Sequence, residues 1–170
     1  MLLESGIVTV RVALGEIVDG MQWQSDEMQA YLNAKTGRIV AVSEEHLAAA
    51  ESGEESSDLQ DWEAEAMEIA RAVLNGEDYI ALPDRFEIDE YRMMERFAHG
   101  VTDAEASALL RRAIKGRGAF RYFKDSIHEL GLVKEWYAYR HQAYEDTAIA
   151  WCEENGIEYT RDDNGSHSDA

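Results

Sequence analysis

The order of hydrophobic and polar residues in the first part of the chain is typical of short strands. β-Branched residues at positions 7, 8, 10 and 12 predict a strand over 7–12, followed by a helix over Ala13–Gln22. Two more β-rich runs, Met28–Leu32 and Arg38–Val42, are joined by a short loop that ends in Gly37. Because glycine readily adopts the left-handed conformation that such a loop requires, the sequence predicts an antiparallel hairpin.

Farther along, apolar residues recur at three- and four-residue spacing and predict an amphipathic helix over Leu59–Leu74. The positions of this apolar stripe are Leu59, Trp62, Ala66, Ile69 and Val73. Asn75 and Gly76 end the helix. The next apolar run, Tyr79–Leu82, predicts a strand that ends at Pro83, the single proline of the chain.

The second half of the chain predicts mainly helices. The first covers Asp89–Ala98, and a capping box of Thr102 and Glu105 starts a second that runs to Lys115. A third helix, beginning near Arg117, ends at Gly131, and its apolar stripe is Phe120, Phe123, Ile127 and Leu130. The longest covers Val133–Asn155, and residues 157–159 predict a last strand.

These elements predict an α+β fold, in which a small antiparallel sheet with a β-hairpin packs against a mostly helical second half. We expect one domain over residues 1–160 and a disordered tail over 161–170. Ten acidic residues and no basic ones lie between Glu44 and Glu68. The glycine- and serine-containing part of this acidic segment, around residues 48–57, is expected to be a mobile loop.

Composition restricts the classes of function. The chain has 170 residues, 45% of them hydrophobic, and 16 basic against 35 acidic residues give a formal charge of −19. This charge opposes general binding to nucleic acids or anionic lipid. One cysteine excludes an internal disulfide framework, and no apolar run reaches the length of a membrane helix. We therefore expect a cytoplasmic protein that does not contact membranes.

Several local patterns together resemble a bacterial family of uncharacterised proteins, number 158 of the UPF series. They are Ser25-Asp26-Glu27, Tyr31-Leu32, Thr36-Gly37, Tyr79–Pro83, Phe120–Asp125, Trp136-Tyr137 with Arg140, and Trp151–Ile157. The resemblance extends from Val12 to Tyr159 except for the acidic stretch 48–58. It implies no activity and no catalytic residues.

The stretch Arg111–Lys124, here called the basic segment, holds six basic residues and no acidic one. We select five of them as a candidate binding site for an anion or a nucleic acid: Arg112, Lys115, Arg117, Arg121 and Lys124. Helical spacing places Arg117, Arg121, Lys124 and His128 on one face. The alternatives are that the segment pairs with the acids of Glu44–Glu68 or forms a solvated face. The overall charge favours these alternatives.

Aromatic residues surround an arginine in the last predicted helix. Trp136, Tyr137, Arg140 and His141 are a candidate ligand pocket, in which the guanidinium would bind a carboxylate or phosphate. The alternative, which we favour, is an aromatic core stripe whose arginine stacks on Trp136 or Tyr144 and pairs with a buried carboxylate.

No metal site, cofactor or catalytic residue is predicted. The five histidines lie too far apart to share one helix face, and no phosphate-binding glycine motif is present. Cys152 is expected to be inert in the core. The leading hypothesis is a non-catalytic cytosolic binding or regulatory protein whose partner is a protein. The first alternative is a nucleic-acid-binding regulator that uses the basic segment, and the second is an enzyme with a site near Trp136, Arg140 and His141.

Overall fold

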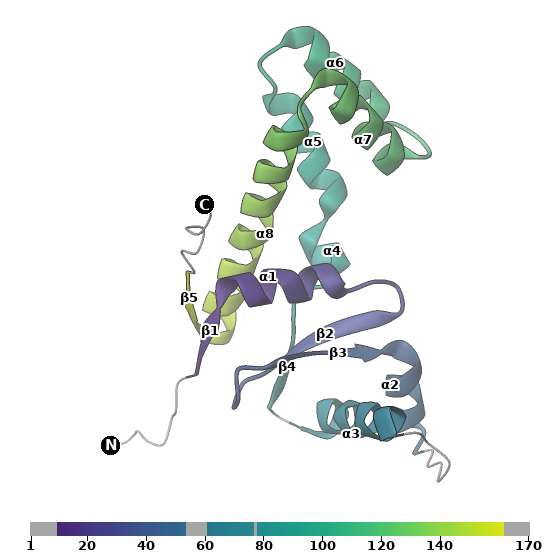
Figure 1. The fold of residues 1–170 in the computed structure, drawn as a ribbon, viewed down its shortest axis with the longest axis vertical. Helices are drawn as coiled ribbons and strands as arrows, with labels where there is room; N and C mark the ends of the chain where they lie inside the picture. Colours follow the sequence, from purple (N-terminus) through teal and green to yellow (C-terminus); the bar gives the residue numbers. More distant parts are fainter. Residues whose placement is uncertain (1–9, 54–60, 77, 162–170) are drawn as a thin grey trace. The chain divides into compact units, whose positions relative to one another are not determined.

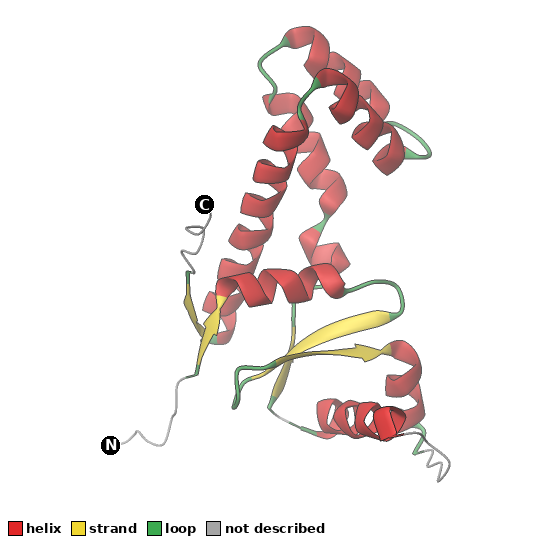
Figure 2. Ribbon diagram, viewed as in Figure 1, coloured by secondary structure: helices red, strands yellow, loops and turns green. Residues whose placement is uncertain are grey.

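The structure, a computed structural model, describes residues 10–53, 61–76 and 78–161. Its helices and two small sheets confirm the α+β class (Figures 1 and 2). The chain divides into two compact units: unit 1 is Met1–Asp84 with Thr147–Ala170, and unit 2 is Arg85–Asp146. This division does not test the prediction of one domain over 1–160. The predicted tail lies outside the described residues from position 162 onward.

Unit 1 contains a three-stranded antiparallel sheet of order β3-β2-β4 and a two-stranded parallel sheet of β1 and β5. Its elements are β1 (Arg11–Ala13), α1 (Leu14–Trp23), β2 (Met28–Asn33), β3 (Ile39–Ser43), α2 (Glu44–Glu51), α3 (Asp61–Asn75), β4 (Tyr79–Ala81) and β5 (Glu158–Thr160). The last residues of α8 (Val133–Asn155) also belong to unit 1. Trp151 on α8 donates a hydrogen bond from Nε1 to the carbonyl oxygen of Ala81 at 2.9 Å, which fixes this end of α8 to β4.

The predicted hairpin is confirmed. Strands β2 and β3 pair antiparallel from Met28 opposite Ser43 to Leu32 opposite Ile39. Gly37 has a φ of +78° in the connecting turn. The Oδ1 atom of Asn33 accepts hydrogen bonds from the backbone N–H groups of Lys35 and Thr36, at 2.9 and 3.2 Å. The side chain and the backbone therefore stabilise the same turn.

Helix α1 packs closely on the three-stranded sheet because it carries a glycine at the contact. An ideal Cβ atom at Gly20 would lie 2.9 Å from both Ile39 Cγ2 and Leu82 Cδ2, which leaves no room for a side chain. Ile17 and Met21 on the same helix are buried. These apolar contacts make the core of unit 1.

Two predictions in the acidic segment are corrected. Helix α2 continues to Glu51, so the expected loop does not begin at residue 48; positions 54–57 of that loop and Leu59 of the apolar stripe lie outside the described residues. In α3 the buried residues are Met67 and Ala70, whereas Trp62 has 65% of its surface exposed. The covered side of α3 includes the small residue Ala70, and a short side chain at such a position lets neighbouring elements approach closely. Trp62, the bulkiest residue of the predicted stripe, lies outside this contact.

Unit 2 is helical. It comprises α4 (Arg85–Ile88), α5 (Glu90–Gly100), α6 (Ala104–Ala113), α7 (Ala119–Leu130) and the first part of α8. The N-cap of α6 is Asp103 rather than the predicted Thr102, since the Asp103 carboxylate accepts from the N–H groups of Glu105 and Ala106. A carboxylate can satisfy both of these groups at once, and the helix begins one residue later than predicted.

Four aromatic rings from three helices form the centre of unit 2. Phe97 of α5 and Phe123 of α7 both meet Trp136 of α8, with ring centroids 5.4 and 4.8 Å apart, and Tyr139 packs against Phe97 at 5.5 Å. Both phenylalanine rings meet Trp136 edge to face, which is a favoured geometry for aromatic pairs. This cluster fixes α7 in place and determines which of its side chains reach the surface.

Within the three described ranges, no helix has the length and apolarity that a bilayer crossing requires.

Candidate functional site

The five candidate residues of the basic segment follow one another along the end of α6, the connecting loop and the start of α7 (Figure 1). Arg112 lies in the last turn of α6, Lys115 and Arg117 lie in the loop, and Arg121 and Lys124 lie on α7. The prediction that a helix begins near Arg117 is wrong, because α7 starts at Ala119 after Gly118. Helical spacing therefore joins only Arg121, Lys124 and His128 on one face.

All five of these side chains are exposed. Among the described residues of unit 2, none of these side chains forms a salt bridge or a hydrogen bond. The neighbouring Arg111 differs, because its Nε donates to Ser107 Oγ at 3.3 Å. The acids of Glu44–Glu68 belong to unit 1, so their pairing with the basic segment stays an alternative.

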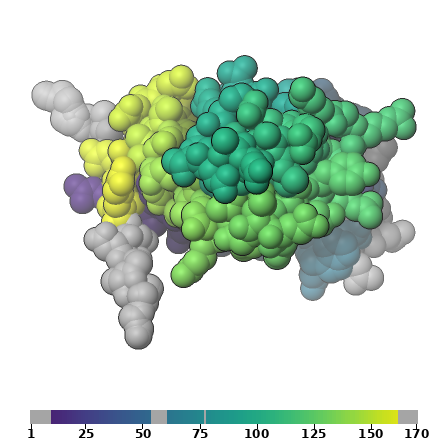
Figure 3. All heavy atoms as spheres, turned by 90° about the horizontal axis from the view of Figure 1, so that it is seen from above, coloured from purple at the N-terminus to yellow at the C-terminus, as the bar shows by residue number. Residues whose placement is uncertain are grey.

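Two aromatic side chains accompany the basic residues on α7. Phe120, which the sequence assigns to the core, has 49% of its surface exposed, and Tyr122 has 56% exposed. Phe123 and Ile127 of the predicted stripe are buried as expected, and the third buried residue of α7 is Ala119. This corrects the predicted stripe by moving its centre away from Phe120. Figure 3 shows the teal and green surface of unit 2.

The formal charge is distributed unequally between the units. Unit 2 has 11 basic and 11 acidic residues, whereas unit 1 has 5 basic and 24 acidic residues, a difference of −19. The excess of negative charge therefore belongs entirely to unit 1. Because exposed charges are screened over about 8 Å at physiological ionic strength, the field at the basic segment depends mainly on its immediate neighbours. The acidic residues next to it on α7 are Asp125 and Glu129.

The four residues of the candidate ligand pocket do not converge. Trp136 is 2% exposed within the aromatic cluster, while Tyr137 has 49% of its surface exposed. His141 is exposed and its Nε2 lies 3.2 Å from Glu145 Oε2 one turn later. The Arg140 side chain pairs with Glu90 on α5. The structure therefore agrees with the core alternative for Trp136 and places the other three in different surroundings.

Arg140 belongs to a hydrogen-bond network within unit 2 that the sequence predicts only in part. Its Nε donates to Glu90 Oε2 at 3.0 Å, and its guanidinium carbon lies 4.6 Å from the centre of the Tyr144 ring. The Tyr144 hydroxyl also donates to Glu90 Oε2. Burial, and then the Glu90 carboxylate, raise the pKa of Tyr144 above its ordinary value, so it remains a neutral donor. The expected carboxylate partner is thus Glu90, 50 residues earlier in the chain.

Two further kinds of group could take part in chemistry: the cysteine thiol and clusters of metal-binding side chains. Cys152 is fully buried, and burial raises the pKa of its thiol to about 11, which disfavours the nucleophilic thiolate. Within the described ranges, no three histidine, cysteine, aspartate or glutamate side chains are placed to hold one metal ion.

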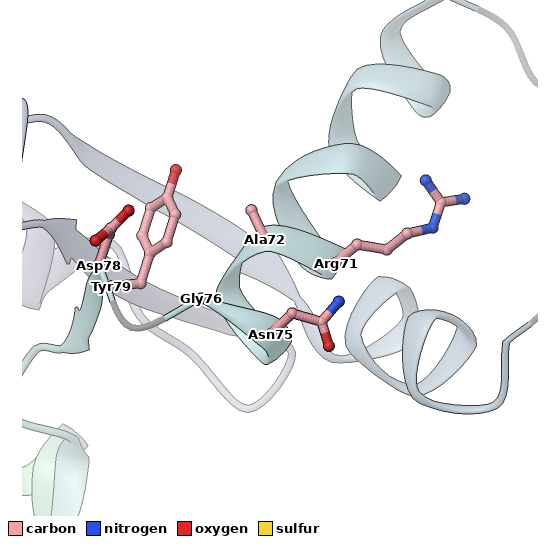
Figure 4. Close-up of a pocket in the computed structure, with 6 residues that line it drawn as sticks. All are labelled: Arg71, Ala72, Asn75, Gly76, Asp78 and Tyr79. Atoms are coloured by element: carbon pink, nitrogen blue, oxygen red, sulfur yellow. The ribbon is translucent and has the colours of Figure 1, made fainter.

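A surface pocket lies at the C-terminal end of α3 in unit 1 (Figure 4). Its lining residues are Arg71, Ala72, Asn75, Gly76, Asp78 and Tyr79. The guanidinium of Arg71 points away from Tyr79, and Asp78 lies 3.7 Å from Lys35 Nζ. The polar groups of this pocket therefore do not converge on a common ligand position.

Comparison with known proteins identifies the family. A family model described as uncharacterised protein family UPF0158 matches residues 8–169. The UPF0158 protein PA5073 of Pseudomonas aeruginosa is 33% identical over 67 residues, which cover 39% of this chain and 44% of that relative, so the match spans less than half of the relative's length. No solved structure matches the chain. The family model extends over nearly the whole sequence, which confirms the resemblance: the chain belongs to the uncharacterised protein family UPF0158.

Proposed function

We propose that this protein is a non-catalytic, nucleic-acid-binding regulator of the bacterial cytoplasm that uses the basic segment. The observation that carries the proposal is the exposure of Arg112, Lys115, Arg117, Arg121 and Lys124 on consecutive elements of unit 2, in which basic and acidic residues are equal in number when these five are included. A row of exposed cations fits a polyanion, because each phosphate that is neutralised releases counterions and adds to the affinity. The relative from Pseudomonas supports a bacterial setting.

The overall charge of −19 is the main argument against nucleic acid, and the separation of charge between the units weakens it. All excess carboxylates belong to unit 1, and unit 2 is formally neutral. Within unit 2, Asp125 and Glu129 follow the basic segment, while Glu105 begins the preceding helix. The charge nearest to a ligand of the basic segment is therefore positive.

Fluorescence anisotropy with labelled single-stranded RNA, single-stranded DNA and duplex DNA tests this function. Binding at low salt is expected to weaken steeply as salt rises, with a log–log slope of about −0.7 to −0.9 for each phosphate contacted. Replacing Arg117 and Arg121 by glutamate should abolish measurable binding, because the substitution both removes two contacts and adds two repulsive charges.

The matched control reverses two exposed basic residues of unit 2 that lie outside the segment, Arg96 and Lys134. This variant has the same net charge as the Arg117→Glu, Arg121→Glu variant, so it separates a local site from a general effect of charge. Retained binding in the control supports the proposal. Equal losses in both variants, or no binding of any nucleic acid by the unmodified protein, would contradict it.

A second candidate function, binding of a positively charged protein, is favoured by an observation on α3. Trp62 is 65% exposed on a helix whose exposed acidic residues include Asp61, Glu65 and Glu68. An exposed tryptophan beside carboxylates suits a lysine- or arginine-rich segment, through charge and cation–π contacts. The leading hypothesis from the sequence is likewise a protein partner, but it places Trp62 in the core.

Titration with a decalysine peptide tests this second function. The affinity should fall severalfold in Trp62→Ala and in the double variant Glu65→Lys, Glu68→Lys. Reversal of the exposed Glu153 and Glu154 on α8 serves as the charge-matched control for that double variant. If the two reversals weaken peptide binding equally, the interaction depends on net charge and α3 is not a specific surface.

A further inference from the structure

We propose that the basic segment selects single-stranded nucleic acid, because Phe120 and Tyr122 offer base-stacking surfaces on the two sides of Arg121. This inference rests on the proposed function and specifies its ligand. The two rings are the exposed large aromatics of α7, and they lie immediately before and after Arg121 in the sequence. Successive residues of a helix are separated by about 100°, so the rings lie on either side of the arginine.

The core of unit 2 accounts for the exposure of these rings. Phe123 and Ile127 take the buried side of α7, and Phe123 is held by the rings of Phe97 and Trp136 at centroid distances of 6.3 and 4.8 Å. Rotation of α7 that buried Phe120 would withdraw Phe123 from this cluster. The exposure of Phe120 is thus fixed by packing.

Tyr122 is held against the loop of the basic segment. An ideal Cβ atom at Gly118 would lie 3.1 Å from Tyr122 Cε2, so the ring covers the glycine and would be displaced by a larger residue. An aromatic ring that is already held in one position loses less conformational freedom when a base stacks on it. The loop that contains Gly118 also carries Lys115 and Arg117.

The chemistry of this arrangement distinguishes single strands from duplexes. Proteins that bind single strands combine basic side chains, which follow the phosphates, with aromatic rings, on which bases stack. In a duplex the base faces are covered by neighbouring bases, and only phosphates and groove edges are accessible. The cations of the basic segment can contact both forms, but Phe120 and Tyr122 can stack only on the unpaired bases of a single strand.

Anisotropy titrations with a labelled ten-nucleotide oligouridylate, the corresponding oligodeoxyuridylate and a ten-base-pair duplex test the inference. We expect tighter binding of the single strands than of the duplex. Phe120→Ala and Tyr122→Ala should each weaken single-strand binding about tenfold and leave the duplex affinity and the salt slope nearly unchanged. Tyr122→Phe retains the ring and should bind like the unmodified protein. Circular dichroism verifies that every variant is folded.

The outcomes separate the inference from the function on which it rests. Equal binding of duplex and single strands, or an unchanged single-strand affinity in both alanine variants, would overturn the stacking surface while leaving a nucleic-acid-binding function intact. Absence of binding to all three probes would overturn both. A comparison of the RNA and DNA single strands shows whether the 2′-hydroxyl contributes to binding. Tighter binding of either single strand than of the duplex supports the inference.

Discussion

Replacement of Phe123 by alanine is expected to lower the free energy of unfolding of unit 2 by about 3–5 kcal/mol. The side chain is fully buried, and its ring contacts both Phe97 and Trp136. Truncation removes the hydrophobic transfer energy of the ring and leaves a cavity among neighbours that are fixed on two other helices, α5 and α8. Chemical denaturation followed by circular dichroism measures this loss, with the midpoint and slope fitted together.

Phe120→Ala provides the control on the same helix, with the same change of residue type. Phe120 is 49% exposed, so its truncation is expected to cost well under 1 kcal/mol. Equal destabilisation by the two substitutions would mean that α7 is rotated about its axis relative to the structure described. The stacking surface inferred for Phe120 and Tyr122 would then be wrong as well.

The elements that the sequence predicts well are those whose signals are local. The β2–β3 hairpin follows from two β-rich runs and a glycine that must adopt positive φ, and all three features lie within 16 residues. Helix α8 begins and ends at the predicted residues because glycines at 131 and 156 bracket it. Such signals depend only on neighbouring residues, and tertiary contacts do not override them.

The rotational phase of the helices could not be predicted as reliably. In both α3 and α7 the spacing of apolar residues defines a stripe, yet Trp62 and Phe120 within those stripes are exposed. A stripe of apolar residues is broader than the contact that a neighbouring element makes. Which edge of the stripe is covered depends on packing partners from distant parts of the chain, and no local pattern contains that information.

The candidate site shows the same division. The basic segment can be recognised in the sequence because its six basic residues lie close together with no acidic residue between them. The equal number of basic and acidic residues in unit 2 becomes apparent only when the bounds of the units are known. The partner of Arg140 could be predicted as a carboxylate but not as Glu90, because the two residues are 50 positions apart. Pairing over such distances follows from the packing of α5 against α8 and leaves no signature in spacing.

Arg140→Met is expected to reduce the free energy of unfolding by about 2 kcal/mol. The side chains of Arg140 and Glu90 are 25% and 26% exposed, so the pair lies between an exposed ion pair, worth below about 1 kcal/mol, and a buried one, whose disruption costs about 3–5 kcal/mol. Methionine keeps much of the length of the arginine side chain and its packing on the Tyr144 ring. The loss therefore reports mainly on the Glu90 carboxylate, which retains the Tyr144 hydroxyl as its donor.

A double-mutant cycle with Glu90→Gln isolates the interaction. If the pair stabilises unit 2, the double variant is more stable than the sum of the two single losses predicts, by about 1–2 kcal/mol. His141→Ala and Tyr137→Ala, which alter exposed neighbours on the same helix, should each change stability by at most about 0.5 kcal/mol. An additive cycle, or an Arg140→Met variant as stable as the unmodified protein, would contradict the structural role of Arg140 and favour its candidate role in ligand binding.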